Sequence, residues 1–416
     1  MKVRFSVATI PIVAFCLPGL LLAPRLSGAA EWWAEPSVRL GLEYNDNIRW
    51  TTQPHNTVHG SVLSPKLDLG ARSEIWQVSG SAELARKRYS GEDGLDRDDR
   101  LFKLASQYKT ERNTWQLDGS LTRDSVITGQ EIDPDVGSTQ IQRERETRTI
   151  SPTWTGMMTE RTQLQLAYQL SDVSYENGVS LGFYDYRNRN IMATLANQLS
   201  VQNQVFITAG YSDFDVSITS FESKTTNVQA GITHIFSESL RATLVAGGRR
   251  TSSEGIVSTC TQKILLLFFG RPVEFCVQTA NITVSQVESG SLLNANLEKQ
   301  FEVARLSATL GRALNPSGSG TQVETDTMKL RIERPVTPML TGVLTVNVYE
   351  IRSETGSASG NDRKSYQIEP SLRWQLTREW SLGALYRYTH LKRANETEAV
   401  TADFVNLMLT YRWPRA

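Results

Sequence analysis

The sequence predicts an all-β chain, specifically a transmembrane antiparallel up-and-down β-barrel of about 18 strands, with sixteen strands as the alternative count. From residue 37 onward, segments of about ten residues alternate apolar and polar side chains. Short polar turns alternate regularly with longer polar loops, as in a bacterial barrel. After the first segment, no run approaches the roughly eighteen apolar residues that a membrane-spanning helix needs.

The first segment is predicted to be a secretory signal. Lys2 and Arg4 form a basic start, residues 5–22 are mostly apolar, and residues 27–30 are small, as a cleavage site requires. A membrane anchor is the alternative, but prolines interrupt the apolar run. We therefore predict a signal peptide over residues 1–30 and a single barrel domain over residues 31–416.

The alternation sorts side chains into two chemically distinct faces. In the segment from residue 115 to residue 122, one face carries Trp115, Leu117, Gly119 and Leu121, and the other carries Gln116, Asp118, Ser120 and Thr122. A β-sandwich would also alternate, but a chain of this length would then need domain boundaries and long crossovers. One polar and one apolar face on nearly every strand favour a barrel with a polar lumen and a lipid-facing exterior.

The strand count follows from the connections. Short turns are expected near residues 73–74, 111–113, 159–161, 197–198, 237–239, 299–300, 335–338 and 377–379. Long loops are expected at about 45–60, 90–98, 125–145, 176–186, 214–224, 252–288, 314–324, 352–363 and 390–400. Eight turns alternating with nine loops give eighteen strands, with both ends of the barrel on the periplasmic side.

Aromatic residues cluster beside the predicted connections. One membrane-interface girdle is expected from Trp76, Trp115, Trp154, Trp374, Trp380 and Trp413, which lie next to short turns or the chain end. The opposite girdle is expected from Tyr44, Tyr89, Tyr211, Tyr349 and Tyr388. Ordinary packing of aromatics in a soluble sheet is the alternative.

The last predicted strand ends on an aromatic residue. Its apolar face carries Val405, Leu407, Leu409, Tyr411 and Trp413. This pattern is similar to the C-terminal signal that the barrel-assembly machinery recognises. The sequence departs from the usual signal because Pro414, Arg415 and Ala416 follow the aromatic residue.

No enzyme, cofactor or metal site is predicted. The sequence lacks nucleophile-elbow, phosphate-loop, zinc-protease and paired-cysteine motifs. His55 and His59 share the first long loop, His234 lies on a strand, and residues 92–99 are acidic. Metal binding, a hydrolase site and calcium or lipopolysaccharide bridging are the respective alternatives to solvated or structural residues. Because 44 Lys+Arg balance 44 Asp+Glu, no nucleic-acid partner is expected.

Cys260 and Cys276 enclose an apolar stretch in the longest predicted loop. An exported chain meets an oxidising compartment, so we predict a disulfide between them. The bond would stiffen a surface loop. Alternatively, the loop folds into the barrel mouth as a constriction or docks a partner.

Charged residues follow the polar face of the predicted strands. The candidates for the lumen are Arg39, Glu43, Asp118, Arg241, Arg249, Glu298, Lys329, Arg331, Glu333, Glu369, Arg373, Arg387 and Arg412. Pairs of opposite charge would hold the walls. The excess of arginine in the later strands also fits contacts with carboxylates or sugar substituents of a passing chain.

The segment Gly41 to Ile48 contains Tyr44, Asp46 and Asn47 at the end of the first predicted strand. It resembles the opening signature of outer-membrane β-barrel proteins, of the porin type, found with exosortase/PEP-CTERM and exopolysaccharide systems. Residues 366–374 and 376–380 are similar to the same group. The resemblance implies a bacterial outer membrane, lipopolysaccharide as a neighbour, and a role beside polysaccharide secretion or surface-protein sorting. It implies no catalytic residues.

Three functions remain open at this point. The first is a pore or exit channel, working with polysaccharide and periplasmic secretion components. The second is a structural or adhesive barrel that its own side chains and loops fill. The third is an outer-membrane enzyme, for which no catalytic group is found.

Overall fold

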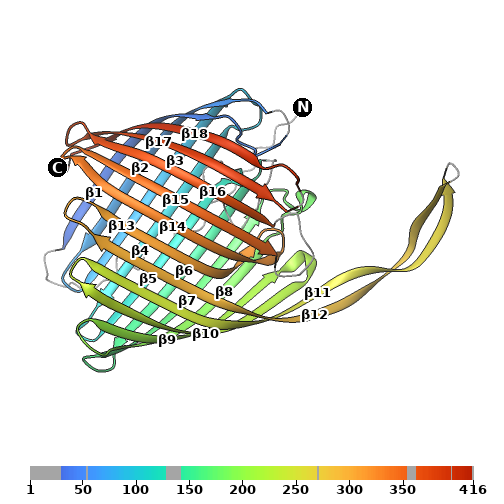
Figure 1. Cartoon of the computed structure of the whole chain (residues 1–416), viewed down its shortest axis with the longest axis horizontal. Helices are drawn as coiled ribbons and strands as arrows, with labels where there is room; N and C mark the ends of the chain where they lie inside the picture. Colours follow the sequence, from blue (N-terminus) through green and yellow to red (C-terminus); the bar gives the residue numbers. More distant parts are fainter. Residues whose placement is uncertain are drawn as a thin grey trace, which may run out of the picture.

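The computed structural model describes residues 30–52, 55–127, 142–268, 271–353, 362–394 and 396–414, and for residues 181, 256–268 and 271–282 it describes the backbone alone. Eighteen strands form one antiparallel sheet (Figure 1). Their bounds are β1 Glu31–Asn45, β2 Val58–Arg72, β3 Trp76–Ser90, β4 Arg97–Lys109, β5 Asn113–Ser125, β6 Glu144–Met157, β7 Thr162–Tyr175, β8 Tyr186–Gln198, β9 Asn203–Val216, β10 Phe221–Ser237, β11 Leu240–Phe268, β12 Arg271–Gln300, β13 Arg305–Ser317, β14 Thr321–Thr337, β15 Leu340–Ser353, β16 Arg363–Gln375, β17 Trp380–Arg393 and β18 Val400–Arg412. The predicted fold class and the count of eighteen are confirmed.

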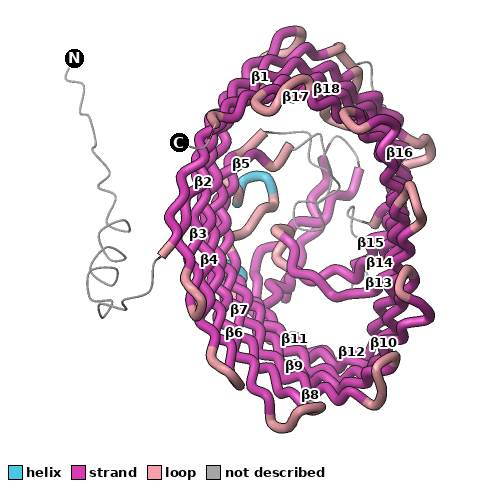
Figure 2. Tube along the Cα trace, turned by 90° about the vertical axis from the view of Figure 1, so that its left-hand side faces the viewer, coloured by secondary structure: helices cyan, strands magenta, loops and turns pink. Residues whose placement is uncertain are grey.

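The sheet closes on itself. Each strand pairs with the next along the chain, and β1 pairs with β18 from Ser37 opposite Arg412 to Asn45 opposite Phe404. Closure leaves no long unpaired edge in the wall, so the backbone polar groups bond within the sheet, as a hydrocarbon surrounding requires. The tube view along the barrel shows the resulting oval ring (Figure 2).

The two ends of the barrel differ. Tight turns such as residues 73–75, 338–339 and 376–379 connect strands at one end, called here the short-turn end. Longer connections such as residues 46–57 and 176–185 lie at the other, called the long-loop end. The predicted signal peptide falls on residues 1–29, outside the described residues, and stays a prediction. No helix in the described part of the chain is long and apolar enough to span a bilayer.

The outward face of the barrel is apolar. Leu42, Ile191 and Leu372 expose 64%, 54% and 51% of their surface to the outside. Exposed apolar side chains recur on alternate positions around the ring, far beyond what a water-soluble monomer presents. This outer surface has the character of a lipid-facing band.

Aromatic residues gather at the short-turn end of that band. Trp115 on β5 stands opposite Trp154 on β6, with ring centroids 6.2 Å apart. Trp380 on β17 contacts Tyr411 on β18 at 4.8 Å, and Trp413 follows Tyr411 at the same distance. Amphipathic rings at one level of a barrel suit the interface between lipid and water.

The prediction of a long loop over residues 252–288 is wrong. β11 and β12 continue through it as a two-stranded hairpin, paired as far as Phe268 opposite Arg271. The hairpin extends away from the long-loop end of the barrel (Figure 1, yellow). Cys260 and Cys276 lie on it, but their side chains are outside the described residues, so the disulfide stays a prediction. Strand pairing continues beyond the barrel wall, where the sequence analysis predicts a loop.

Two smaller expectations also fail. Residues 314–324 form the ends of β13 and β14 with a tight turn at residues 318–320. Tyr89 and Tyr349 do not join an outer girdle: the Tyr89 hydroxyl donates to Glu43 at 2.8 Å inside the barrel, and Tyr349 packs on a buried apolar cluster. Both residues lie near long loops as predicted, but the alternation of side chains along β3 and β15 directs these two into the lumen.

Candidate functional site

Strand parity divides the wall into an outer face and a lumen face. On β1, Leu40 and Leu42 face outward, so Arg39 and Glu43 take the opposite face, and Glu43 is buried. On the other strands, exposed apolar neighbours such as Leu117, Met328 and Leu407 mark the outer face in the same way. The remaining charged candidates have lumen parity: Asp118, Arg241, Arg249, Glu298, Lys329, Arg331, Glu333, Glu369, Arg373, Arg387 and Arg412.

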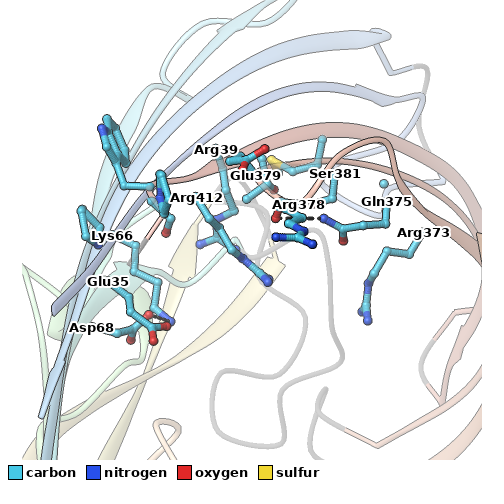
Figure 3. Close-up of a pocket in the computed structure, with 17 residues that line it drawn as sticks. Glu35, Arg39, Lys66, Asp68, Arg373, Gln375, Arg378, Glu379, Ser381 and Arg412 are labelled. Atoms are coloured by element: carbon cyan, nitrogen blue, oxygen red, sulfur yellow. Dashed lines mark hydrogen bonds and ion pairs between the residues drawn. The ribbon is translucent and has the colours of Figure 1, made fainter. Parts of the chain in front are cut away.

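A cavity of about 1050 Å³ opens at the short-turn end (Figure 3). It lies beside the β1–β18 closure and is lined by the starts or ends of β1, β2, β16, β17 and β18. Its charged lining consists of five basic residues (Arg39, Lys66, Arg373, Arg378 and Arg412) and three acidic residues (Glu35, Asp68 and Glu379). Basic charge therefore exceeds acidic charge in this vestibule.

The basic residues of the vestibule differ in whether they form ion pairs. Lys66 pairs with Asp68 at 2.8 Å, and Arg39 pairs with Glu83. Within the described residues, the guanidinium groups of Arg373, Arg378 and Arg412 have no ion-pair partner. Figure 3 shows Arg373 and Arg412 pointing into the same open space. Three unpaired arginines around one water-filled cavity can take up carboxylate or phosphate groups with paired hydrogen bonds.

Further along the lumen on the same side of the barrel, several charges are paired across strands. A second cavity of about 400 Å³ is lined in part by Arg39, Glu43, Lys87 and Arg387. Lys87 pairs with Asp99 at 3.0 Å, Arg387 pairs with Glu369, and Glu43 accepts from Tyr89 and from Asn406. Each of these pairs joins two strands, so they brace the wall and leave little free charge.

The other candidates are spread along the lumen. Arg249 is buried and pairs with Glu324 at 3.1 Å, and Arg331 pairs with Glu333 on its own strand at 3.0 Å. Glu298 accepts from Asn296 at 3.3 Å. Asp118, Arg241 and Lys329 have lumen parity and no partner within the described chain. The structure thus brings Arg39, Arg373 and Arg412 together and leaves the seven candidates of this paragraph apart.

The long-loop end has a feature that the sequence reasoning missed. There several lumen-facing positions are apolar, and they form two buried clusters. The first cluster contains Ile48, Val58, Leu95, Val126, Ile127, Val173, Tyr175, Phe183, Tyr186, Phe214 and Val216. The second contains Trp50, Val323, Ile351, Leu391, Val400 and Ala402. A break in the polar face at the long-loop ends of β9, β14 and β17 was the available signal.

Connections also fold inward at this end of the barrel. The turn between β13 and β14 reaches the β7–β8 connection, where the Tyr184 amide donates to the Gly318 carbonyl at 2.8 Å. On the same hairpin, Gln322 accepts from Ser223 of β10 at 2.7 Å. A side chain on Gly318 would overlap the Tyr175 hydroxyl, so glycine permits this approach. Figure 2 shows chain inside the ring.

Two of the histidines and most of the acidic segment contact other side chains in the described chain. No group of three potential metal ligands occurs in the described chain. His234 contacts Asn203 at 2.7 Å, and His59 lies against the Tyr44 ring. In the acidic segment, Glu92 pairs with Arg49, and Asp96, Asp98 and Asp99 also contact basic side chains.

The chain shows distant likeness to solved barrels. No family model and no curated protein matches it. OccK5 (OpdH) of Pseudomonas aeruginosa is 11% identical, with a TM-score of 0.44, over 92% of this chain and 98% of that one. A BenF-like porin from Pseudomonas fluorescens Pf-5 is 10% identical, with a TM-score of 0.46, over 92% and 98%. The ferric-catecholate import receptor Fiu of E. coli is 10% identical, with a TM-score of 0.47, over 94% and 82%.

Proposed function

We propose that the chain is an outer-membrane channel that admits hydrophilic, preferentially anionic solutes through its short-turn end. The outward apolar surface and the tryptophans at one level support a membrane location. The polar lumen and the vestibule of about 1050 Å³ support a water-filled path. The single observation that carries the preference for anions is the set of unpaired arginines, Arg373, Arg378 and Arg412.

The orientation follows from barrel architecture. In bacterial barrels the short turns face the periplasm and the long loops face outside. The vestibule is then the periplasmic mouth, and the buried apolar clusters lie at the extracellular end. A solute produced inside the cell would meet the arginines first.

A polysaccharide bearing carboxylates is the substrate class we favour for export. Arginine binds a planar carboxylate with two parallel hydrogen bonds, and the vestibule is large enough for several polar groups at once. The resemblance in residues 41–48 to barrels of exopolysaccharide and exosortase systems supports this choice. A role in surface-protein sorting would use the same outer-membrane position.

Outer-leaflet lipids, including lipopolysaccharide, are the proposed neighbours. On the outer face near the long-loop end, ion pairs join adjacent strands, for example Arg187 with Asp172 and Arg189 with Asp213 at 2.7 Å. A ring of charge above an apolar band suits phosphorylated head groups. Export by residues 1–30 and insertion through the barrel-assembly signal in β18 complete the proposed route.

A closed structural barrel is the second candidate. Phe214 and Leu391, one in each buried cluster, are both 0% exposed, so these parts of the long-loop end are packed like a protein core. A barrel filled in this way would pass little current and serve as an anchor or adhesive platform.

Planar-bilayer recording of the refolded mature chain separates the two candidates. We expect a current whose reversal potential in a salt gradient indicates anion preference and which uronic-acid oligosaccharides interrupt. Replacing Arg373, Arg378 and Arg412 together by Gln should remove that preference. Arg334→Gln is the matched control, because this exposed arginine has outer-face parity near the same end. Anion preference that survives the triple change would contradict the assignment, and a folded barrel without current would favour the structural candidate.

A further inference from the structure

The segment after β1, which carries the signature residues Asp46 and Asn47, is buried and bonded to the last strand. Residues Asn45–Thr51 leave β1, turn into the barrel, and are called here the latch segment. Asn45 and Asn47 are polar residues at the start of a loop, yet they are 3% and 1% exposed. Polar side chains buried this deeply are normally held by hydrogen bonds, and these are.

Asn47 fastens the segment to the last strand. Its side-chain Nδ2 donates to the carbonyls of Thr51 and Thr401, each at 3.0 Å. Its Oδ1 accepts from the Thr51 amide at 3.0 Å, and its own amide donates to Asn45 Oδ1 at 2.9 Å. One amide side chain therefore closes the loop on itself and ties it to β18 across the seam of the barrel.

Asp46 provides a second tie to β18. Its amide donates to the Asp403 carbonyl at 3.2 Å, and its carboxylate accepts from the Asp403 amide at 2.7 Å. These bonds continue the β1–β18 register beyond Asn45 opposite Phe404. The segment thus follows β18 before it turns inward.

Two apolar side chains of the latch segment enter different clusters. Ile48 belongs to the cluster formed with β2, β7, β8, β9 and neighbouring connections, and Trp50 belongs to the cluster formed with β14, β15, β17 and β18. Trp50 has a φ of 50°, a conformation that is unfavourable for a bulky residue. Arg393 donates to its carbonyl at 2.7 Å and holds it there. The segment links the two halves of the apolar closure.

The latch segment also forms an ion pair with the β3–β4 connection. Arg49 lies between Ile48 and Trp50 and pairs with Glu92 in the β3–β4 connection. The segment is therefore held from β18 on one side and from the β3–β4 connection on the other. Apolar side chains packed across a pore exclude water and ions.

We propose that the latch segment keeps the extracellular end of the channel closed, and that the channel opens when the bonds of Asn47 to Thr401 and Thr51 are released. This inference rests on the proposed channel function and adds a closed resting state to it. In this proposal the hydrogen bonds of the signature residues Asp46 and Asn47 hold the segment in place, and the side chains of Ile48 and Trp50 close the lumen. An opening signal would then be whatever competes for the latch at the cell surface.

The test compares Asn47→Ala with the wild type and with Asn56→Ala in planar bilayers. Asn56 lies in the same β1–β2 loop, exposed and without a side-chain bond within the described chain, so its replacement controls for loss of an amide alone. Losing several buried hydrogen bonds should raise the ratio of open to closed time roughly ten- to a hundredfold. Hydrogen exchange of residues 46–51 is measured on the same proteins, together with the barrel's thermal unfolding.

The expected result is faster exchange and higher open probability in Asn47→Ala, with barrel unfolding unchanged and Asn56→Ala like the wild type. Faster exchange with an unchanged nonzero current would refute the latch and leave the channel standing. Faster exchange with no current in any protein would refute both. Unchanged exchange would refute the fastening role of Asn47. If Asn47→Ala does not fold, Trp50→Gly is measured instead, because it removes the indole ring from the closure but keeps the hydrogen bonds of Asn47. A current of the Trp50→Gly variant equal to that of the wild type would also refute the latch.

Discussion

Replacing Phe214 by Ala tests whether the long-loop end is a packed core. The ring is 0% exposed, contacts Tyr186 at a centroid distance of 5.3 Å and contacts Phe221 at 6.1 Å. Removing a fully buried phenylalanine leaves a cavity that its neighbours fill only in part. We expect a loss of about 3–5 kcal/mol in the free energy of unfolding.

The assay is equilibrium urea unfolding of the protein in phospholipid vesicles, followed by tryptophan fluorescence. Ile207→Ala is the matched control, because Ile207 lies on the same strand but is half exposed on the outer face. Lipid can occupy the space that this change vacates, so the cavity contribution disappears and the loss should be clearly smaller. Equal losses for the two variants would refute the conclusion that the end of the lumen is packed like a core.

Three further predictions concern other parts of the barrel. Glu369→Gln or Arg387→Gln alone should destabilise the barrel more than the two changes together, because each single change leaves the remaining charge buried without its partner. A double-mutant cycle measures the coupling between the two residues, and additive losses of stability would contradict this prediction. Cys260→Ser with Cys276→Ser should abolish a reductant-dependent shift in gel mobility and leave the current unchanged, because the hairpin extends away from the barrel; an altered current would contradict that geometry. Gly318→Ala should loosen the inward-folded turn and increase its cleavage by protease, since the added methyl overlaps a neighbouring side chain, and unchanged cleavage would contradict this packing.

Alternation made the wall of the barrel predictable from the sequence. A strand with one face in lipid and one in water must change chemistry at every residue, so a segment such as Leu164 to Leu170 fixes both its type and its orientation. The same rule placed Arg39 and Arg412 on one face. Their convergence at one cavity depends on closure of β1 on β18, which no local pattern contains.

The rest of the site depends on contacts between segments far apart in the sequence. We expected a polar lumen throughout, and so did not treat Val323 and Leu391 as parts of one cluster. Their burial depends on Trp50, which reaches them only after the chain has folded inward. The prediction of a loop over residues 252–288 assumes that strands end at the membrane surface. β11 and β12 continue beyond it.

The outer part of the β11–β12 hairpin takes no part in the barrel wall within the described chain. Beyond Glu254 on β11 and before Leu293 on β12, the two strands pair only with each other within the described chain. About fifteen residues at 3.3 Å each carry this ribbon roughly 50 Å past the ring. A cut there, or an inserted epitope, would leave every wall contact in place. The chain could therefore be made and assembled as two separate polypeptides, each contributing complete strands to one closed barrel.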